Sequence, residues 1–323
     1  MSLLFCKFSL ILSQIKLDTM KIVFFGSASF AVPSLNILIE NGYDIAGVVT
    51  APDKFGGRGK KKKLETAVKK YATEKGLQIF QPRNLKSRDF VEKLKALEPD
   101  LQVVVAFRML PKVVWSIPPE GTFNLHASLL PAYRGAAPIN WTIINGERYS
   151  GCTTFFIDDK IDTGEILFQM KATVGEDETA GELHDRLMTL GSELVLKTVK
   201  AIESGDYELQ KQDESLVTKA PKLNRSNCRI NFDQAAHEVI DFIRGMSPYP
   251  AAWTRFGERE IKIMEARKVI ECKTTAQPGT YFANRNELLY FCKDGAIKVL
   301  ELKPEGKRKM NVQDFLNGYN FNQ

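Results

Sequence analysis

From Met20 onward, short apolar runs alternate with amphipathic segments, and this alternation restricts the fold more than any other feature of the chain. The runs 21–26, 43–51, 77–82 and 100–107 are typical of strands, whereas 33–42, 64–76 and 87–99 have apolar residues at helical spacing. The run DLQVVVAF (100–107) is apolar at nearly every position, as in a strand that is covered on both faces. We therefore predict an α/β domain with a doubly wound, mostly parallel sheet, which binds ligands at the carboxyl ends of its strands.

A further strand is predicted at 121–128, and it carries Asn124 and His126 near its end. Their i, i+2 spacing points both side chains to one face of an extended segment. Such a pair could be a buried, mutually satisfied contact or part of a site. Its place at the end of a strand in this class of sheet favours a site.

Nucleotide cofactors are disfavoured by the glycine pattern. Gly26 follows the first strand, but the G-x-G-x-x-G spacing of dinucleotide-binding folds is absent. The run GGRGKKKK (56–63) also lacks the spacing of a P-loop, and no Ser or Thr follows its lysines. We therefore do not expect NAD or a nucleoside triphosphate to bind here.

A β-hairpin is predicted from the strand CTTFFI (152–157) through the acidic turn DDKIDTGEIL (158–167). Asp158, Asp159 and Asp162 lie in this turn. Acidic turn residues are common for reasons of turn chemistry alone, and the EF-hand pattern of calcium ligands is missing. Spacing by itself therefore assigns none of them a catalytic role.

Four stretches in this order resemble the methionyl-tRNA formyltransferases: VFFGSASFAVPSL, APDKFGGRGKKKK, FNLHASLLPAYRGAAPINW and IDDKIDTGEIL. The resemblance extends to the C-terminal LELKPEGKRKMNVQDFLNG. It implies an enzyme that transfers the formyl group of 10-formyltetrahydrofolate to the amino group of methionyl initiator tRNA for translation initiation. It also implies a small OB-like β-barrel as the second domain, and no metal.

The resemblance also implies roles for individual residues. Asn124, His126 and Asp162 match the catalytic residues of the family, and Ser128, Leu129, Leu130 and Pro131 match its folate contacts. The basic loop implied to bind tRNA holds Arg58, Lys60, Lys61, Lys62 and Lys63. Two departures from the family pattern, Ser27-Ala28-Ser29 and Phe107-Arg108, change the expected pocket wall and leave the three catalytic positions intact.

The three catalytic positions suit the chemistry of formyl transfer. Attack by an amine on a formyl group places negative charge on the former carbonyl oxygen, and an Asn amide beside an imidazolium can donate hydrogen bonds to it. A nearby carboxylate would orient the imidazole and could take the proton that the amine sheds. The other histidines, His184 and His237, lie in amphipathic segments and are expected to pack or face solvent, and Cys152 is expected in the core.

The resemblance and the strand pattern together predict the domain organisation. Residues 1–19 form an extension or follow from a wrongly assigned start codon, 20–205 form the catalytic domain, 206–225 a linker, and 226–323 the OB-like tRNA-binding domain. A surface tracking phosphates could include Lys222, Arg225, Lys303, Lys307, Arg308 and Lys309, or these could be ordinary solvated side chains.

Composition adds the cellular setting. The 323 residues carry a formal charge of +6, which is compatible with a polyanionic partner. The five cysteines are scattered without C-x-x-C spacing, and no transmembrane run is present, so we expect a reducing, cytoplasmic location. We also expect a monomer. Open alternatives are formyltransferases acting on glycinamide ribonucleotide or amino-sugar nucleotides, a formyltetrahydrofolate hydrolase, and an RNA-binding module without activity.

Overall fold

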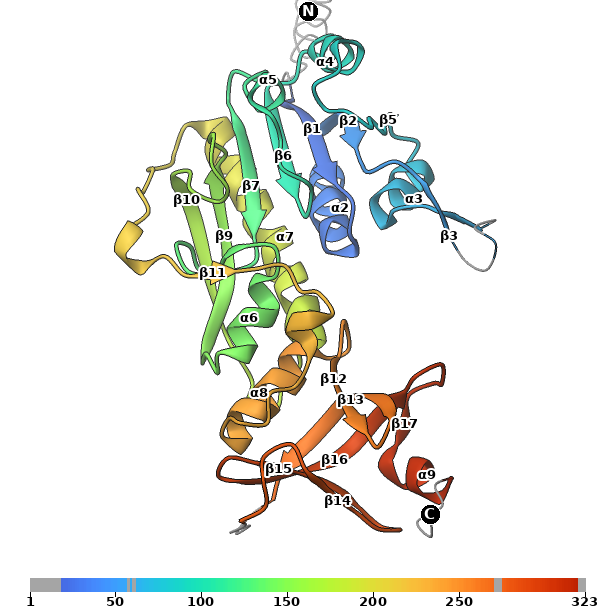
Figure 1. Ribbon diagram of the computed structural model, residues 1–323. Coiled ribbons are helices and arrows are strands. Elements are labelled where there is room, and N and C mark those ends of the chain that lie inside the picture. Colours follow the sequence, from blue (N-terminus) through green and yellow to red (C-terminus); the bar gives the residue numbers. More distant parts are fainter. Residues whose placement is uncertain (1–18, 57–58, 60–61, 270–274, 319–323) are drawn as a thin grey trace, which may run out of the picture.

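The computed structural model describes residues 19–56, 59, 62–269 and 275–318, which form two lobes (Figure 1). The predicted extension 1–19 lies outside the described residues except for Thr19. The first lobe contains the larger sheet, and the second contains a smaller antiparallel sheet.

Within the described residues the larger sheet has seven strands in the order β10-β9-β7-β6-β1-β2-β5. Five of them are parallel: β1 (Lys21–Gly26), β2 (Asp44–Val49), β5 (Ile79–Phe80), β6 (Leu101–Val105) and β7 (Thr122–His126). β9 (Tyr149–Phe156) runs antiparallel to β7, and β10 (Ile166–Thr173) completes the hairpin. The predicted α/β class with a mostly parallel sheet is confirmed.

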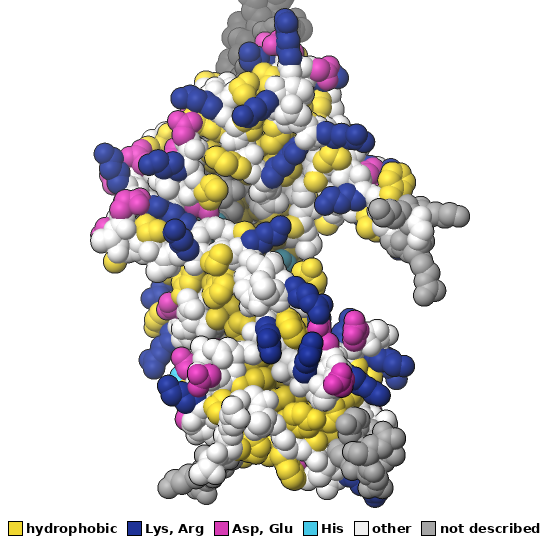
Figure 2. Space-filling view, viewed as in Figure 1, with side chains coloured by type: hydrophobic (Ala, Val, Ile, Leu, Met, Phe, Trp, Pro, Cys, Tyr) yellow, Lys and Arg dark blue, Asp and Glu magenta, His cyan; other side chains and the backbone are white. Residues whose placement is uncertain are grey.

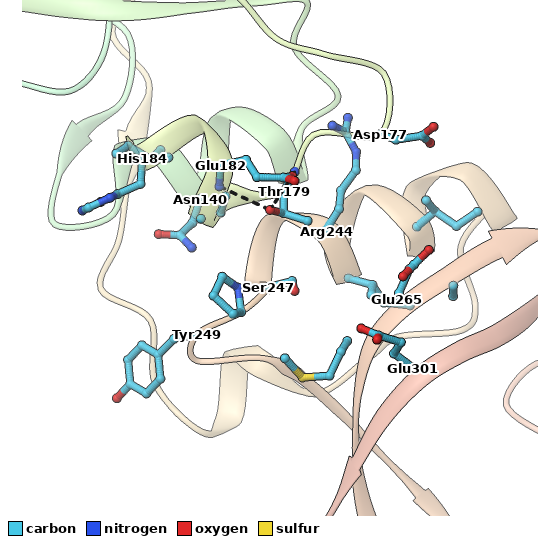
Figure 3. A pocket seen from close by; sticks show the side chains of 18 of the residues that line it. Asn140, Asp177, Thr179, Glu182, His184, Arg244, Ser247, Tyr249, Glu265 and Glu301 are labelled. Atoms are coloured by element: carbon cyan, nitrogen blue, oxygen red, sulfur yellow. Dashed lines mark hydrogen bonds between the residues drawn. The ribbon is translucent and has the colours of Figure 1, made fainter. Parts of the chain in front are cut away.

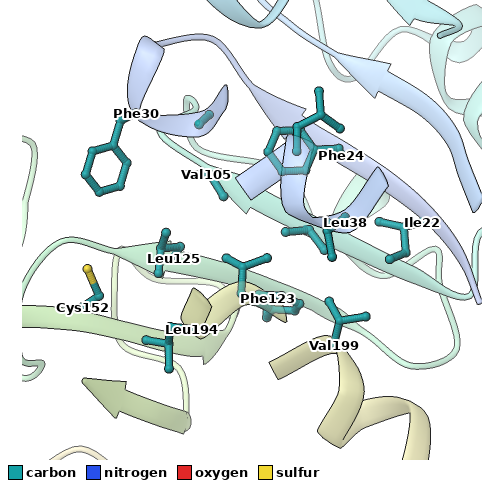
Figure 4. Close-up of a cluster of buried hydrophobic side chains, with 14 of the residues drawn as sticks. Ile22, Phe24, Phe30, Leu38, Val105, Phe123, Leu125, Cys152, Leu194 and Val199 are labelled. Atoms are coloured by element: carbon teal, nitrogen blue, oxygen red, sulfur yellow. The ribbon is translucent and has the colours of Figure 1, made fainter. Parts of the chain in front are cut away.

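The sequence of β1 is apolar because the strand contributes residues to two hydrophobic clusters. Ile22 and Phe24 belong to one cluster, and Val23 and Phe25 to the other, so alternate residues face opposite sides of the sheet and all four are buried. Figure 4 shows the first cluster, where these strand residues meet Leu194 and Val199 of α7. The helices of this lobe are α2 (Val32–Glu40), α3 (Ala67–Glu74), α4 (Arg88–Lys95), α5 (Lys112–Trp115), α6 (Pro138–Ile144) and α7 (Ala180–Ser204), with the 3-10 turn η1 (Ser29–Ala31).

The second lobe is a curled antiparallel sheet that is barrel-like, as predicted (Figure 1). Its strands are β12 (Ala252–Phe256), β13 (Arg259–Lys268), β14 (Tyr281–Ala283), β15 (Leu288–Cys292), β16 (Gly295–Pro304) and β17 (Met310–Asn311). They enclose a separate core around Tyr290, Ile263 and Leu302, covered by α8 (Ala236–Met246) and α9 (Val312–Asn317). Each lobe therefore has its own hydrophobic core.

The segment between the lobes returns to the first lobe before it enters the second. β11 (Lys219–Ala220) pairs in parallel with β8 (Arg134–Gly135), and Gln210 exchanges backbone hydrogen bonds of 2.8 and 3.0 Å with Ile166. The 3-10 turns η3 (Glu214–Leu216) and η4 (Ser226–Cys228) lie along this segment. These contacts place the connecting chain directly beside the ends of β7 and of the β9–β10 hairpin.

Candidate active site

A cavity of about 660 Å³ lies at the carboxyl ends of the parallel strands. Its walls come from the chain after β1, the segment after β6, the end of β7 and the turn between β9 and β10. Asn124, His126 and Asp162 all line it. The structure therefore brings the three predicted catalytic residues together although Asp162 is 36 positions from His126.

His126 is fixed by contacts on both sides of its ring. Its side chain is buried, with 6% of the residue exposed, and Nε2 lies 2.9 Å from the backbone carbonyl of Tyr133. Because a carbonyl oxygen only accepts hydrogen bonds, Nε2 carries a proton in this arrangement. Nδ1 is then the nitrogen that faces the Asp162 carboxylate, 3.8 Å away. The ring orientation is set by the protein before any substrate binds.

Asp162 is held by backbone geometry. Its Oδ2 accepts a hydrogen bond of 2.9 Å from the Gly135 amide, and its own backbone has a left-handed φ of 57°. The carbonyl of Asp162 accepts a further bond of 3.0 Å from the Gln212 side chain, which belongs to the connecting segment. No local sequence pattern points to Gln212, because its contact with Asp162 forms only when the chain returns 50 residues later.

Asn124 presents a free amide to the cavity. It pairs with Val104 of β6 and Phe155 of β9 through the backbone. Its side chain lines the cavity, and no hydrogen bond from it is found within the described residues. An amide N–H beside a fixed imidazole is the donor arrangement that can stabilise a developing oxyanion.

The segment Ser128–Pro131 supports the site from outside the cavity lining. Ser128 and Leu130 are buried, and the Ser128 hydroxyl donates to the Ala132 carbonyl at 2.6 Å. Thr153 donates to the Ser128 carbonyl and accepts from the Leu130 amide. These bonds fix the turn that delivers the Tyr133 carbonyl to His126. The folate contacts implied for Ser128, Leu129, Leu130 and Pro131 stay a prediction.

Comparison with known proteins identifies the family of this chain. The formyl transferase family model matches residues 20–199, and the model of the formyl transferase C-terminal domain matches 222–320. The methionyl-tRNA formyltransferase of Flavobacterium johnsoniae is 49% identical over 94% of this chain and 98% of its own length. That of Bacteroides fragilis strain NCTC 9343 is 43% identical over 95% and 98%. The chain belongs to the methionyl-tRNA formyltransferase family. It is an enzyme of formyl transfer.

Solved structures share the fold of this formyltransferase at low identity. An N-formyltransferase from Helicobacter canadensis, solved with folinic acid and dTDP-3-aminofucose, has a TM-score of 0.67 at 22% identity, covering 87% of this chain and 99% of that one. HypX from Aquifex aeolicus, solved with tetrahydrofolic acid, has a TM-score of 0.64 at 19% identity, covering 92% and 47%. These similarities confirm the two-lobe arrangement.

The basic loop of the formyltransferase is carried by the hairpin of β3 (Lys54–Gly56) and β4 (Lys62–Leu64). Arg58, Lys60 and Lys61 lie outside the described residues. Lys62 is exposed, and no ion pair of its side chain is found in the described part of the chain. Lys63, in contrast, lies 3.0 Å from Asp53 and 3.0 Å from Glu65. The two neighbouring lysines therefore differ in their availability to a ligand.

A second cavity, of about 960 Å³, lies where α7 and α8 meet the second sheet (Figure 3). It shares the lining residues Ile139, Asn140 and His184 with the catalytic cavity, so the two cavities have a wall in common. The rings of His184 and Phe30 pack in a T-shaped arrangement, with 5.3 Å between their centroids. His184 therefore packs, which is one of the two roles expected from sequence, and it also lines the walls of both cavities. Acidic side chains outnumber basic ones in the lining: Asp177, Glu182, Asp185, Glu265 and Glu301 against Arg244, Arg267 and Lys309.

Three further observations bear on the expectations from sequence. Cys152 is fully buried in the core as predicted, and burial raises the pKa of its thiol to about 12. His237 is exposed on α8. In the part of the chain that the structure describes, no three His, Cys, Asp or Glu side chains are grouped as metal ligands would be, and no helix is long and apolar enough to cross a membrane.

Proposed function

We propose that this enzyme transfers the formyl group of 10-formyltetrahydrofolate to the free amino group of methionyl initiator tRNA, for translation initiation. The observation that carries the proposal is the buried His126 ring, held between the Tyr133 carbonyl and Asp162 beside the free amide of Asn124. The curated relatives at 43–49% identity over nearly their full length support the acceptor. Folate ligands in two solved structures of the same fold support the donor.

The reaction needs hydrogen-bond donors to an oxyanion, and it needs a way to take a proton from the amine and supply one to N10. The amine nitrogen attacks the formyl carbon, the C=O electrons move to oxygen, and the bond between the formyl carbon and N10 then breaks. Over the whole step the amine loses a proton and N10 gains one. The amide of Asn124 and a ring N–H of His126 stabilise the oxyanion, and Asp162 orients His126 and assists the proton transfer.

The chain has a basic surface for RNA, but part of its positive charge is already paired with acidic side chains. Figure 2 shows a hollow between the two lobes, with Lys and Arg side chains around it. Two cations of the expected phosphate-tracking surface are already engaged: Arg225 of the connecting segment contacts Glu260, and Lys309 of the second lobe lies 2.6 Å from Glu301. We therefore assign the acceptor-end contacts mainly to the basic loop, whose members include Arg58 and Lys62, with the OB-like lobe as a further tRNA-binding surface.

The test of the reaction is formylation of charged initiator tRNA with 10-formyltetrahydrofolate, scored as formyl-methionine. His126→Ala and Asp162→Asn should lower kcat about 100- to 1,000-fold, because each acts on charge that develops in the transition state. Binding of the charged tRNA, measured by filter retention, should be unchanged in both. Turnover of glycinamide ribonucleotide or of an amino-sugar nucleotide in place of the tRNA would contradict the proposed acceptor.

The test of the loop compares neighbouring lysines. Lys62→Gln should raise KM for charged tRNA and lower the salt slope by about 0.7–0.9 for a lost phosphate contact, whereas Lys63→Gln should change the slope less because Lys63 is paired with acids. Arg58→Ala should raise KM for tRNA and leave KM for the donor unchanged, since a guanidinium can bind phosphate and stack on a base. Equal salt slopes in all three variants and the parent would contradict this role.

A further inference from the structure

Tyr133 has a backbone conformation that its residue type seldom adopts, and its carbonyl group contacts the catalytic histidine. Its φ is +62°, in the left-handed region that is unfavourable for a residue with a side chain. The same residue supplies the carbonyl oxygen that lies 2.9 Å from Nε2 of His126. An unfavourable conformation persists only where the surrounding contacts hold it, and such conformations gather at functional sites. The contacts that hold Tyr133 therefore bear on the geometry of His126.

Thr218 of the connecting segment holds the backbone on both sides of Tyr133. It lies just before β11, and its hydroxyl oxygen accepts a hydrogen bond of 2.8 Å from the Tyr133 amide. The carbonyl of Thr218 accepts a second bond, of 3.0 Å, from the Arg134 amide. These two amides belong to the peptide groups that flank the α-carbon of Tyr133, so Thr218 fixes both groups. The Tyr133 side chain is anchored separately, because its hydroxyl donates to Glu147 at 2.7 Å.

The position of the Tyr133 carbonyl decides which nitrogen of His126 can exchange a proton during the reaction. While Nε2 donates to that carbonyl, it keeps its proton, and Nδ1 is the nitrogen left to gain or release one. Nδ1 faces Asp162 at 3.8 Å, on the side of the catalytic cavity. If the carbonyl turned away, the ring could rotate and carry its proton on either nitrogen. Only the first arrangement keeps proton transfer on the side where Asp162 lies.

We propose that Thr218 is a positioning residue for formyl transfer. Its hydroxyl holds the Tyr133 backbone so that His126 keeps its proton on Nε2 and uses Nδ1 in the reaction. Thr218 is exposed and does not line the catalytic cavity, so it acts through Tyr133 and not on a substrate. The inference rests on the proposed function, and it adds a residue of the connecting segment to the three catalytic positions.

The kinetic test replaces Thr218 by Val, which keeps the shape of the side chain and removes the hydroxyl. The Thr218 carbonyl and the pairing of β11 with β8 stay in place. In formylation of charged initiator tRNA, kcat should fall about five- to tenfold, as expected for the loss of one hydrogen bond, while KM for the tRNA and for the donor stays unchanged. Thr218→Ala should give the same result. Thr218→Ser keeps a hydroxyl and should restore kcat.

The proton on the His126 ring gives a second readout that does not depend on turnover. The chain has three histidines, so isotopic labelling of histidine nitrogens for NMR gives few ring signals, and His126→Gln assigns those of His126. With the ring neutral, the parent enzyme should carry the proton on Nε2. Thr218→Val should show a mixture of the two tautomers, and Thr218→Ser should return the parent spectrum.

Thr280→Val is the matched control, because it removes an exposed hydroxyl of the second lobe that donates to the Gln277 carbonyl at 2.6 Å. It should leave kcat and the His126 spectrum unchanged. Parental kcat in Thr218→Val, or a lowered kcat with the proton still on Nε2, would overturn the positioning role. A raised KM for charged tRNA with kcat unchanged would show that Thr218 binds RNA, and would overturn it too. Absence of turnover in the parent enzyme would instead contradict the proposed function, while the spectrum would still report on Thr218.

Discussion

At the scale of single residues, Gly135 determines where Asp162 can lie. Its amide donates to the Asp162 carboxylate, and its backbone has a φ of +132° that side-chain-bearing residues rarely adopt. A Cβ on Gly135 would lie 2.5 Å from the carbonyl oxygen of Ala220 in the connecting segment. Gly135, which has no side chain to take part in the reaction, therefore positions the Asp162 carboxylate that faces His126.

Gly135→Ala should lower kcat and destabilise the protein together. We expect a loss of about 1–3 kcal/mol in the free energy of unfolding, because the methyl group must displace backbone and the left-handed φ is strained. Urea unfolding and formylation kinetics measure the two effects. Gly42→Ala is the control, since Gly42 has a φ of +80° but nothing within 4 Å of its Cβ position. It should cost stability and retain kcat; an unaltered kcat in Gly135→Ala would contradict the positioning role.

At the scale of elements, a charge network joins the base of the basic hairpin to α3. Asp53 lies 2.5 Å from Lys69 and 3.0 Å from Lys63, and it also accepts from the Gln81 side chain at 2.8 Å. The hydrogen bond from Lys69, followed by those from Gln81 and Lys63, holds the pKa of Asp53 well below its ordinary value of 3.8. The hairpin that carries the basic loop is thus anchored through one carboxylate.

This network predicts a pH dependence of stability. A carboxyl whose pKa is lower in the folded state stabilises the fold fully above its unfolded pKa and loses that effect as pH falls through the folded pKa. The difference in urea midpoint between the parent and Asp53→Asn should therefore be present at neutral pH and shrink below about pH 4. Asp89→Asn, which removes an exposed i, i+4 partner of Lys93, should show little difference at any pH. A constant difference for Asp53→Asn would contradict the prediction.

The elements also show what sequence reasoning can reach. The parallel strands were predictable because the run 100–107 is apolar at nearly every position, and burying such a strand requires cover on both faces. The shared face of Asn124 and His126 followed from the period-two alternation of side chains along a strand. The Nε2 bond of His126 to Tyr133 and the support of Asp162 by Gln212 were not predictable, because both depend on turns and long-range contacts that no local pattern encodes.

At the scale of the whole molecule, α6 of the first lobe packs closely against α8 of the second. The Asn140 side chain donates to the Gly245 carbonyl at 2.8 Å, and a Cβ on Gly245 would lie 2.6 Å from the Ile144 side chain. Arg244 adds a bond of 3.1 Å to the Glu178 carbonyl. Asn140 lines both cavities, so this helix contact forms part of the wall that the two cavities share.

Gly245→Ala should separate α6 from α8. We expect a loss of about 1–3 kcal/mol in the free energy of unfolding from overpacking, faster proteolysis near the junction, and a raised KM for charged tRNA with KM for the donor unchanged. Gly318→Ala is the control, because its Cβ position lies 3.6 Å or more from other atoms. If stability and both KM values match the parent, the helix contact does not govern the opening between the lobes.

The return of the connecting segment limits how this protein could be recombined with others. A catalytic half cut at residue 205 would keep Asn124, His126 and Asp162 but lose the Gln212 bond to Asp162 and the strand that pairs with Arg134 and Gly135. A junction placed after Pro221 would keep both. A gene fusion or domain exchange that preserves formyl transfer therefore has to include the connecting segment with the catalytic half. The segment of chain that must be exchanged as one piece is longer than the larger sheet alone suggests.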